Sequence, residues 1–307
     1  LLFSDRGVAY ALPTYRVPQC SRAAKGTPIV QLLPIPREES ITSLLSVSSF
    51  DEESHLLMLT KSGFIKRTSL AAFSKVRSNG LIAIGLEEGD ALTWVRLAVS
   101  GDSVLIASRT GMTIHFRISD KELRPLGRTA RGVRSMNLRT GDSLVSMDVL
   151  PKELADQVAT SFEEESDADS DSSSVNEGPW VLVASATGLG KRVPVTQFRL
   201  QKRAGMGLRA MKFRREGDEL VGLRVLGHGE ELLLVSEKGV IVRTSADKVP
   251  QQSRAATGVK LQRLDSGDHL SEVVLVPPEP EDQESEEPLV NTAGSDESAE
   301  LNEDSPL

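Results

Sequence analysis

The sequence predicts an all-β protein, a propeller-like β-pinwheel built from four-stranded blades. Three observations lead to this prediction. Short β-rich runs recur in five groups of four, glycines stand at the same two places in each group, and helical spacing is almost absent. The first glycines of successive groups are 56, 48, 77 and 51 residues apart, and an acidic insert of 28 residues accounts for the longest interval. A period near 50 residues with four strands is typical of propeller-like blades.

The first two runs of each group predict a β-hairpin. A β-rich run is followed within three residues by a glycine, and a second β-rich run such as Phe64–Thr68 comes directly after that glycine. Two such runs joined by a short glycine-containing turn are typical of a hairpin. The first runs are Leu1–Ser4, Leu56–Thr60, Val104–Ser108, Val181–Ser185 and Leu232–Ser236, and their glycines are Gly7, Gly63, Gly111, Gly188 and Gly239.

The third and fourth runs complete each predicted blade. A polar stretch ends in a second glycine, a third apolar run follows closely, and in four groups a Gly-Asp pair precedes the fourth run, as before Glu219–Leu226. Because turn residues bound every run, we expect the four runs of a group to form one antiparallel sheet. The second glycines are Gly26, Gly80, Gly132, Gly207 and Gly258, and the third runs are Ile29–Leu33, Leu81–Leu86, Val133–Leu138, Leu208–Phe213 and Val259–Leu264.

The repeats define one predicted domain with two acidic additions. We expect a β-pinwheel over residues 1–276, an acidic disordered insert at 152–179 and an acidic disordered tail at 277–307, because both acidic stretches are charged, Ser-rich and poor in apolar residues. Helical spacing occurs only over Pro151–Phe162, on the insert. The predicted blades cover about 1–48, 56–98, 104–150, 180–226 and 232–276.

The formal net charge of −8 conceals a basic body. The insert holds nine acidic residues and one lysine, and residues 276–307 hold eleven acidic residues and no basic one. The remaining 247 residues carry 35 Lys and Arg against 24 Asp and Glu, a net charge of +11. An acidic tail on a basic domain is therefore indicated. The tail is either a solubilising segment or a competitor of DNA for the basic surface.

Other totals exclude whole classes of protein. The single cysteine, Cys20, excludes a disulfide framework and indicates a reducing compartment. No apolar run approaches the roughly 20 residues of a membrane span. The chain opens on Leu1-Leu2-Phe3 in the middle of a pattern, so it reads as part of a longer protein.

The polar stretch before each second glycine is the most basic feature of the repeat. An arginine stands four residues before the glycine in four groups and three before it in the second, and the second run of the hairpin adds further cations. On equivalent blades these residues would form a belt around the rim. The predicted DNA-binding residues are Arg22, Lys25, Lys66, Arg67, Lys75, Arg77, Arg117, Arg128, Arg131, Lys191, Arg192, Lys202, Arg203, Arg243 and Arg254.

A belt of evenly repeated cations suits duplex DNA, which carries one charge per roughly 1.7 Å of its axis. Phosphate contacts would hold the duplex, and a curved rim would bend it with little sequence preference. The sequence has only 12 aromatic residues, which disfavours binding of single strands because that needs stacking platforms. The alternative from another class is a propeller that docks a protein partner without nucleic acid.

The interpretation of the chain as an enzyme or a metal-binding protein has weaker support than the interpretation as a DNA-binding protein. The four histidines are scattered without a second ligand at metal spacing, and Cys20 has no histidine at motif distance. Gly188–Arg192 departs from the phosphate-loop pattern, and the Gly-Asp pairs read as turns. Tyr10 and Tyr15 lie in blade-forming segments, so we expect no catalytic residue, metal or cofactor in this chain.

The repeat resembles the C-terminal domain of the gyrase A subunit of bacterial type II topoisomerases, over residues 1 to about 276. Its hairpins (Ser62-Gly63 with Lys66-Arg67), R-x-x-x-G loops and Gly-Asp turns match that family. The stretches Gly190–Pro194 and Arg203–Met211 are most similar to cyanobacterial members. Further matching stretches are Glu237–Arg243, Thr27–Pro34, Gly188–Pro194 and Gln252–Val259.

The resemblance implies a six-bladed pinwheel whose neighbouring blades exchange strands, and which wraps duplex DNA with positive writhe. It implies membership of an ATP-dependent gyrase that introduces negative supercoils. In that A2B2 enzyme, a region upstream of residue 1 would bind the two partners, which are a second A subunit and the gyrase B subunit. ATP, Mg²⁺ and the nucleophilic tyrosine would belong to the rest of the enzyme, which is cytoplasmic and bacterial rather than plastid. The family's Q-R-R-G-G-K-G box is matched at only four of seven positions, by Gln201–Gly207, which leaves as an alternative a topoisomerase IV-type subunit.

Overall fold

The computed structural model describes residues 1–21, 23–155 and 178–276. These residues belong to one compact unit, Leu1–Pro277. Most of the predicted acidic insert, the whole predicted acidic tail and Arg22 lie outside the described residues. Of the predicted helix Pro151–Phe162, residues 152–155 are helical, and the segment from 156 onward is outside the described part.

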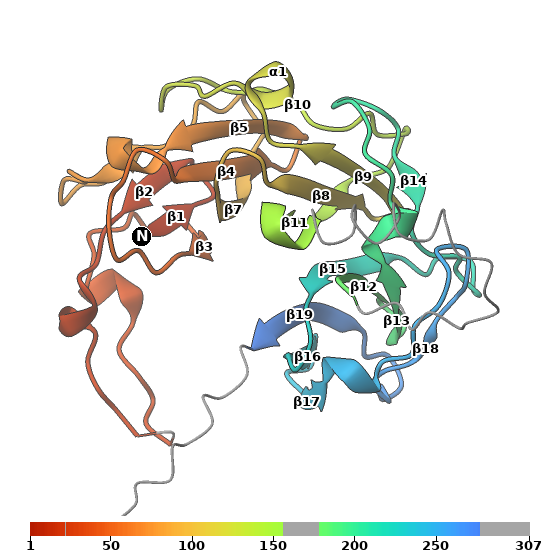
Figure 1. The fold of residues 1–307 in the computed structure, drawn as a ribbon. Coiled ribbons are helices and arrows are strands. Elements are labelled where there is room, and N and C mark those ends of the chain that lie inside the picture. Colours follow the sequence, from red (N-terminus) through yellow and green to blue (C-terminus); the bar gives the residue numbers. More distant parts are fainter. Residues whose placement is uncertain (22, 156–177, 277–307) are drawn as a thin grey trace, which may run out of the picture. The chain divides into compact units, whose positions relative to one another are not determined.

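The described chain is all-β, which confirms the predicted fold class (Figure 1). It forms four sheets of four strands and one of three. In sheet order, the first sheet contains β3 (Ile41–Leu44), β1 (Leu2–Ser4), β2 (Val8–Tyr10) and β6 (Leu81–Ile82). The second sheet contains β7 (Leu92–Ala98), β4 (His55–Thr60), β5 (Phe64–Ser69) and β10 (Val133–Arg134).

The remaining three sheets repeat the same order. The third contains β11 (Leu144–Leu150), β8 (Ser103–Ser108), β9 (Met112–Arg117) and β14 (Leu208–Arg209). The fourth contains β15 (Leu220–Leu226), β12 (Trp180–Ser185), β13 (Leu189–Pro194) and β18 (Val259–Lys260). The fifth contains β19 (Leu270–Val276), β16 (Glu231–Ser236) and β17 (Ile241–Ser245).

The last strand of each four-stranded sheet comes from the following repeat. Leu81 of β6 pairs with Ala9, Val133 of β10 with Ile65, and Val259 of β18 with Gly190, always in antiparallel register. The expectation that each group of four runs forms its own sheet is therefore wrong, and the exchange implied by the family resemblance is present. Each such strand is only two residues long, so it gains its stability from the neighbouring sheet rather than from its own unit.

The two ends of the strand series differ from its middle. Within the described residues, β17 has no exchanged strand on its free side. The third run of the first group, predicted as a strand over Ile29–Leu33, forms the 3-10 helix η2 (Ile29–Gln31), because the described chain offers no preceding sheet with which it could pair.

The strands at the opposite edge of every sheet converge. Neighbouring members of the set β3, β7, β11, β15 and β19 contact one another. Thr42, Trp94, Val145, Val221 and Ser271, one from each strand, line a common cavity of about 430 Å³. These five strands therefore form the inner edge of the blades, and the exchanged strands form the outer edge.

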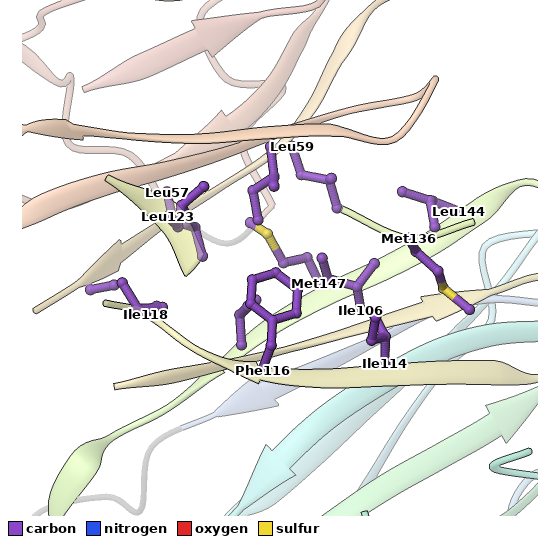
Figure 2. Close-up of a cluster of buried hydrophobic side chains, with 13 residues drawn as sticks. Leu57, Leu59, Ile106, Ile114, Phe116, Ile118, Leu123, Met136, Leu144 and Met147 are labelled. Carbon is purple, nitrogen blue, oxygen red and sulfur yellow. The ribbon is translucent and has the colours of Figure 1, made fainter. Parts of the chain in front are cut away.

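The hydrophobic core lies between adjacent blades. Figure 2 shows the second of these interfaces, where Leu57 and Leu59 of β4 meet Ile106 of β8 and Ile114 and Phe116 of β9. The other face of β4 packs on the first blade, because successive residues of a strand point to opposite faces. The central strands of the first four sheets are buried on both faces, which explains their unbroken apolar runs. In β16, every second residue is only partly buried. Each fully buried aliphatic or aromatic side chain contributes roughly 1.5–3 kcal/mol.

Short helices follow several hairpins. The α-helix α1 (Asp120–Leu123) begins at Ser119, whose Oγ accepts a hydrogen bond from the amide of Glu122 at 3.4 Å. The sequence does not predict it, because four residues carry no readable helical period. The 3-10 helices are η1 (Thr14–Arg16), η2, η3 (Leu70–Phe73), η5 (Val195–Gln197) and η6 (Ala246–Lys248). No helix among the described residues is both long and apolar enough to cross a membrane.

Candidate nucleic-acid interface

The basic loops lie at the outer edge of the blades. In the second to fifth repeats, each loop ends at the second glycine and continues at once into the exchanged strand, as Arg128–Gly132 does into β10. The loop of one repeat therefore passes over the hairpin of the blade before it. This placement agrees with a cationic belt at the rim.

In the last three repeats, the glycine that ends the loop is required by the close approach of two backbones. Gly132, Gly207 and Gly258 have φ values of 101°, 75° and 90°. A Cβ atom on Gly132 would lie 2.5 Å from the carbonyl oxygen of Ile65, and one on Gly258 would lie 2.6 Å from that of Gly190. Glycine alone combines a positive φ with the absence of a side chain, so it allows the loop to reach the neighbouring blade.

Backbone hydrogen bonds join each loop to the blade before it. Six residues before the final glycine, the amides of Leu126, Gln201 and Gln252 each donate at 2.8 Å to the second hairpin strand of that blade, at Arg67, His115 and Arg192. Two residues before the glycine, the carbonyls of Ala130, Gly205 and Ala256 accept from the amides of Gly85, Asn137 and Lys212 at 3.2, 2.9 and 3.3 Å. Three junctions thus share one pattern, which fixes each loop at both ends.

Two of the predicted DNA-binding lysines are buried beneath these loops. Lys66 and Lys191 are both 0% exposed, so they do not present their charge to a ligand at the surface. The Nζ of Lys66 donates to the carbonyls of Gly127 and Arg128, and the Nζ of Lys191 to those of Ser253, Arg254 and Ala256. Burial, with a smaller effect of the Arg128 guanidinium, lowers the pKa of Lys66 to about 7. Burial and Arg254 lower the pKa of Lys191 to about 8.

The residue that follows each of these two lysines also contacts the next repeat. Arg67, 1% exposed, pairs with Asp120 of α1, so it too is interior rather than at the surface. Arg192 pairs with Asp247 at 2.9 Å and donates from Nε to the carbonyl of Val249. A guanidinium at this position joins successive blades.

His115 occupies the same position in the third blade. Its Nδ1 lies 2.6 Å from the carbonyl oxygen of Phe198, and its Nε2 lies 2.8 Å from Ser103 Oγ. Because a carbonyl only accepts, Nδ1 carries the proton. Burial lowers the pKa of His115, which favours a neutral ring that accepts from the serine.

Three of the arginines that stand four residues before the glycine, Arg128, Arg203 and Arg254, are half-buried. Arg203 donates from Nη1 to the carbonyl of Arg134 at 2.6 Å, and Arg254 does so to the carbonyl of Arg209 at 2.8 Å. Through Nη1, each guanidinium therefore holds the exchanged strand of the preceding repeat. The guanidinium has five N–H donors, so further donors stay available to a phosphate. The Arg128 side chain has no ion-pair partner among the described residues.

The other predicted residues differ in their exposure and in their ion pairing. Lys25, Lys75, Arg77 and Lys202 are exposed, and Arg117 is half-buried. Arg131 is exposed, pairs with Glu87 and lies 4.2 Å over the ring of Phe64, and Arg243 is exposed and pairs with Glu231.

A further row of cations lies at the outer edge and was not predicted. Arg134, Arg209 and Lys260 are the second residues of three successive exchanged strands, and all three are exposed. Their signal is readable in the sequence, because each stands two residues after the second glycine of its repeat. The prediction took its cations from the basic loops and the second runs, and named none from the third runs.

The Gly-Asp pairs act as turns, as expected. Each aspartate accepts a hydrogen bond from the hairpin turn of its own blade. Asp90 accepts from the amide of Ser62 at 2.8 Å, and Asp142 accepts from the amide and hydroxyl of Thr110 at 3.0 and 2.6 Å. Burial by itself would raise the pKa of Asp142, but hydrogen bonds with Thr110, Ser108 and Ser143 together outweigh it, so the pKa is lowered.

All five repeats match known sequences. The family described as "DNA gyrase C-terminal domain, beta-propeller" matches residues 1–48, 54–98, 102–151, 179–226 and 230–277. The DNA gyrase A protein of Synechocystis is 52% identical over 290 residues, which cover 92% of this chain and 34% of that protein. The chloroplastic/mitochondrial DNA gyrase A protein of Arabidopsis thaliana is 40% identical, over 95% of this chain and 31% of that protein.

Solved structures share the fold. A DNA gyrase A C-terminal domain superimposes with a TM-score of 0.70 at 25% identity, over 89% of this chain and 80% of that one. The C-terminal domain of a DNA topoisomerase IV gives 0.72 at 23% identity, over 90% and 78%. The chain spans about a third of the length of the curated relatives that it matches.

Proposed function

The chain belongs to the family of DNA gyrase C-terminal β-propeller domains, and on that premise we propose that it binds duplex DNA along its basic outer edge and wraps it. The observation that carries this proposal is the row formed by Arg134, Arg209 and Lys260. These cations occupy one position in three successive exchanged strands, at the edge of the blades that faces away from the central cavity. A duplex that follows this edge meets cations at the repeat interval of the blades.

The basic loops supply the remaining phosphate contacts. Arg128, Lys202, Arg203 and Arg254 precede the exchanged strands, and Lys25, Lys75 and Arg77 belong to the loops of the first two repeats. Smoothly bending 20–30 bp costs of order 1–6 kcal/mol, which phosphate contacts must offset. Contacts of this kind read charge rather than base edges, so we expect weak sequence preference.

At the level of the whole enzyme, we propose a role within DNA gyrase. The names of the relatives support a place in gyrase A, and the family implies a complex of two A subunits with gyrase B that introduces negative supercoils at the expense of ATP. In this proposal the chain wraps DNA and the rest of the enzyme performs cleavage and ATP hydrolysis, in the bacterial cytoplasm. Topoisomerase IV would instead relax or decatenate DNA, so supercoiling of a relaxed plasmid by the full complex separates the two.

The outer-edge row gives the first test. In a triple variant, Arg134→Ala, Arg209→Ala and Lys260→Ala, we expect binding of a duplex of about 150 bp to weaken. The slope of log affinity against log salt should fall by about 2.7, because each neutralised phosphate of B-DNA contributes about 0.9. Mobility shifts over a range of salt concentrations measure both quantities.

The matched control removes three cations elsewhere. Lys61, Arg109 and Lys238 are exposed in the turns of three hairpins and belong neither to the exchanged strands nor to the basic loops. Their replacement by alanine gives the same net charge as the triple variant and should change the slope little. If both variants lose the same affinity, the protein attracts DNA by net charge alone and the outer edge is not the binding surface.

A further inference from the structure

Lys66 and Lys191 are unusual among the cations of this chain. Both stand three residues after the hairpin glycine of their blade, both are fully buried, and neither has a carboxylate partner among the described residues. A buried ammonium without a counter-ion is costly unless it is hydrogen-bonded. Their partners show what they do, since every acceptor is a backbone carbonyl of the basic loop that belongs to the next repeat.

Each amine has enough N–H donors for all of its carbonyl acceptors. Three carbonyls, at 2.6, 2.7 and 2.7 Å, surround the Nζ of Lys191, and an ammonium has three N–H bonds. Two carbonyls, at 3.0 and 2.6 Å, accept from Lys66, which even a neutral amine can supply. In both cases the carbonyl of the loop arginine itself, Arg128 or Arg254, is among the acceptors. The lysine thus fixes the backbone from which that arginine projects.

The other junctions show that this side chain and the form of the loop vary together. The third blade has Ile114 at the lysine position, and the loop above it contains Ala204 at a φ of 61° and an additional glycine, Gly205. The first blade has Tyr10 there, and the loop that follows in the second repeat has its arginine, Arg77, three residues before the glycine instead of four. The loops of the third and fifth repeats, which lie over a lysine, keep the R-x-x-x-G spacing without an additional glycine or a positive φ between the arginine and the final glycine.

We propose that Lys66 and Lys191 are positioning residues for DNA binding, each holding the loop of the next blade so that its arginine faces a phosphate. This inference rests on the function proposed above. Neither lysine touches DNA in this scheme, because both are enclosed by the loop that they hold. Each acts on its own junction, Lys66 on Arg128 and Lys191 on Arg254.

A double-mutant cycle within one junction is the decisive experiment. Lys66→Met keeps the length of the side chain and removes its donors, and Arg128→Ala removes the phosphate contact. We expect each change to weaken duplex binding roughly tenfold, the scale of one charge-assisted hydrogen bond. Together they should weaken it by clearly less than the product, because a misplaced Arg128 has already lost its contact. Lys66→Met combined with Arg254→Ala, in another junction, should weaken binding by the full product.

Loss of loop order can be measured without DNA. Hydrogen exchange of the amides over residues 124–132 should accelerate in Lys66→Met and stay unchanged over 250–258, and the reverse should hold for Lys191→Met. Val242→Met is the matched control, since Val242 stands at the lysine position of the fifth blade, where the described residues place no basic loop above it. If Lys66→Met does not fold, Lys66→Gln, which retains two amide donors, and Lys191→Met test the same point.

The outcomes separate this inference from the function on which it rests. Unchanged affinity in Lys66→Met alongside weakened affinity in Arg128→Ala would overturn the positioning role. Equal coupling within and between junctions would also overturn it, because that is the behaviour of general destabilisation. If the unaltered chain fails to bind the duplex, the proposed function fails, and exchange over 124–132 still decides whether Lys66 orders the loop.

Discussion

At the scale of single residues, the same amino acid serves two purposes in this repeat. Lys202 is exposed in a loop, whereas Lys66 is enclosed beneath one and satisfied by backbone carbonyls. The sequence does not distinguish the two lysines, since Lys66 is followed by Arg67, and two adjacent cations indicate side chains that are exposed to solvent. Charge in the sequence therefore predicted a basic region, but not which of its cations reach the surface.

The lowered pKa values of Lys66 and Lys191 predict a pH dependence of stability. In the unfolded chain a lysine keeps its proton up to a pKa near 10.5, whereas in the folded chain these two release it near 7 and 8. Between those limits the unfolded state binds more protons, so the free energy of unfolding rises as pH increases from about 7 toward 10. Urea midpoints of the unaltered chain should rise over this range relative to those of a Lys66→Met, Lys191→Met double variant. Parallel curves would show that the two lysines titrate normally.

At the scale of elements, the exchanged strand connects neighbouring blades. Two residues such as Val133–Arg134 cannot form a stable strand alone, yet they complete the outer edge of the second sheet and continue from a loop held by that same sheet. Each junction therefore combines strand pairing, buried apolar contact and the hydrogen bonds that hold the loop. Its formation requires both repeats, so neighbouring blades are expected to unfold together.

The glycine at the end of each loop tests this junction directly. Gly132→Ala places a methyl group 2.5 Å from the carbonyl oxygen of Ile65, where the atom in the way is backbone and cannot move aside cheaply. Gly141, in the Gly-Asp turn of the same repeat, also has a positive φ, 79°, but nothing lies within 4 Å of its Cβ position. We expect Gly141→Ala to reduce the free energy of unfolding by about 1 kcal/mol and Gly132→Ala by clearly more. Chemical denaturation measures both, and equal losses would mean that conformation alone requires glycine at 132.

Much of the element pattern could be predicted because the physics that sets it is local. Continuous apolar runs such as Val104–Ser108 indicate strands buried on both faces, and glycines mark the turns between them. The pairing of the third runs could not be predicted from the residues, since a two-residue strand fits the sheet of its own repeat as well as the sheet of the preceding repeat. The family resemblance supplied that information. For the same reason the row of Arg134, Arg209 and Lys260 could be recognised only once the outer edge was known.

At the scale of the whole molecule, charge is divided between segments of opposite sign. The body outside the two acidic stretches carries +11, and the cations of the proposed interface belong to it. The blades place successive copies of one basic loop and one exchanged strand along a single edge, which converts a repeat in sequence into a repeat in space. A polyanion of uniform charge density can use every copy at once, and its affinity then depends steeply on salt.

The acidic C-terminal segment predicts a way in which this affinity is limited. Deleting residues 277–307 removes eleven acidic residues and no basic one, which changes the net charge from −8 to +3. If these carboxylates compete with phosphates for the basic edge, the deletion should tighten duplex binding by roughly tenfold at low salt. The gain should shrink at higher salt, where the Debye length falls to about 8 Å. A chain with the segment shuffled should behave like the unaltered one, and a chain with its acids changed to Gln and Asn should behave like the deletion. Identical salt titrations for all four proteins would leave the segment only a solubilising role.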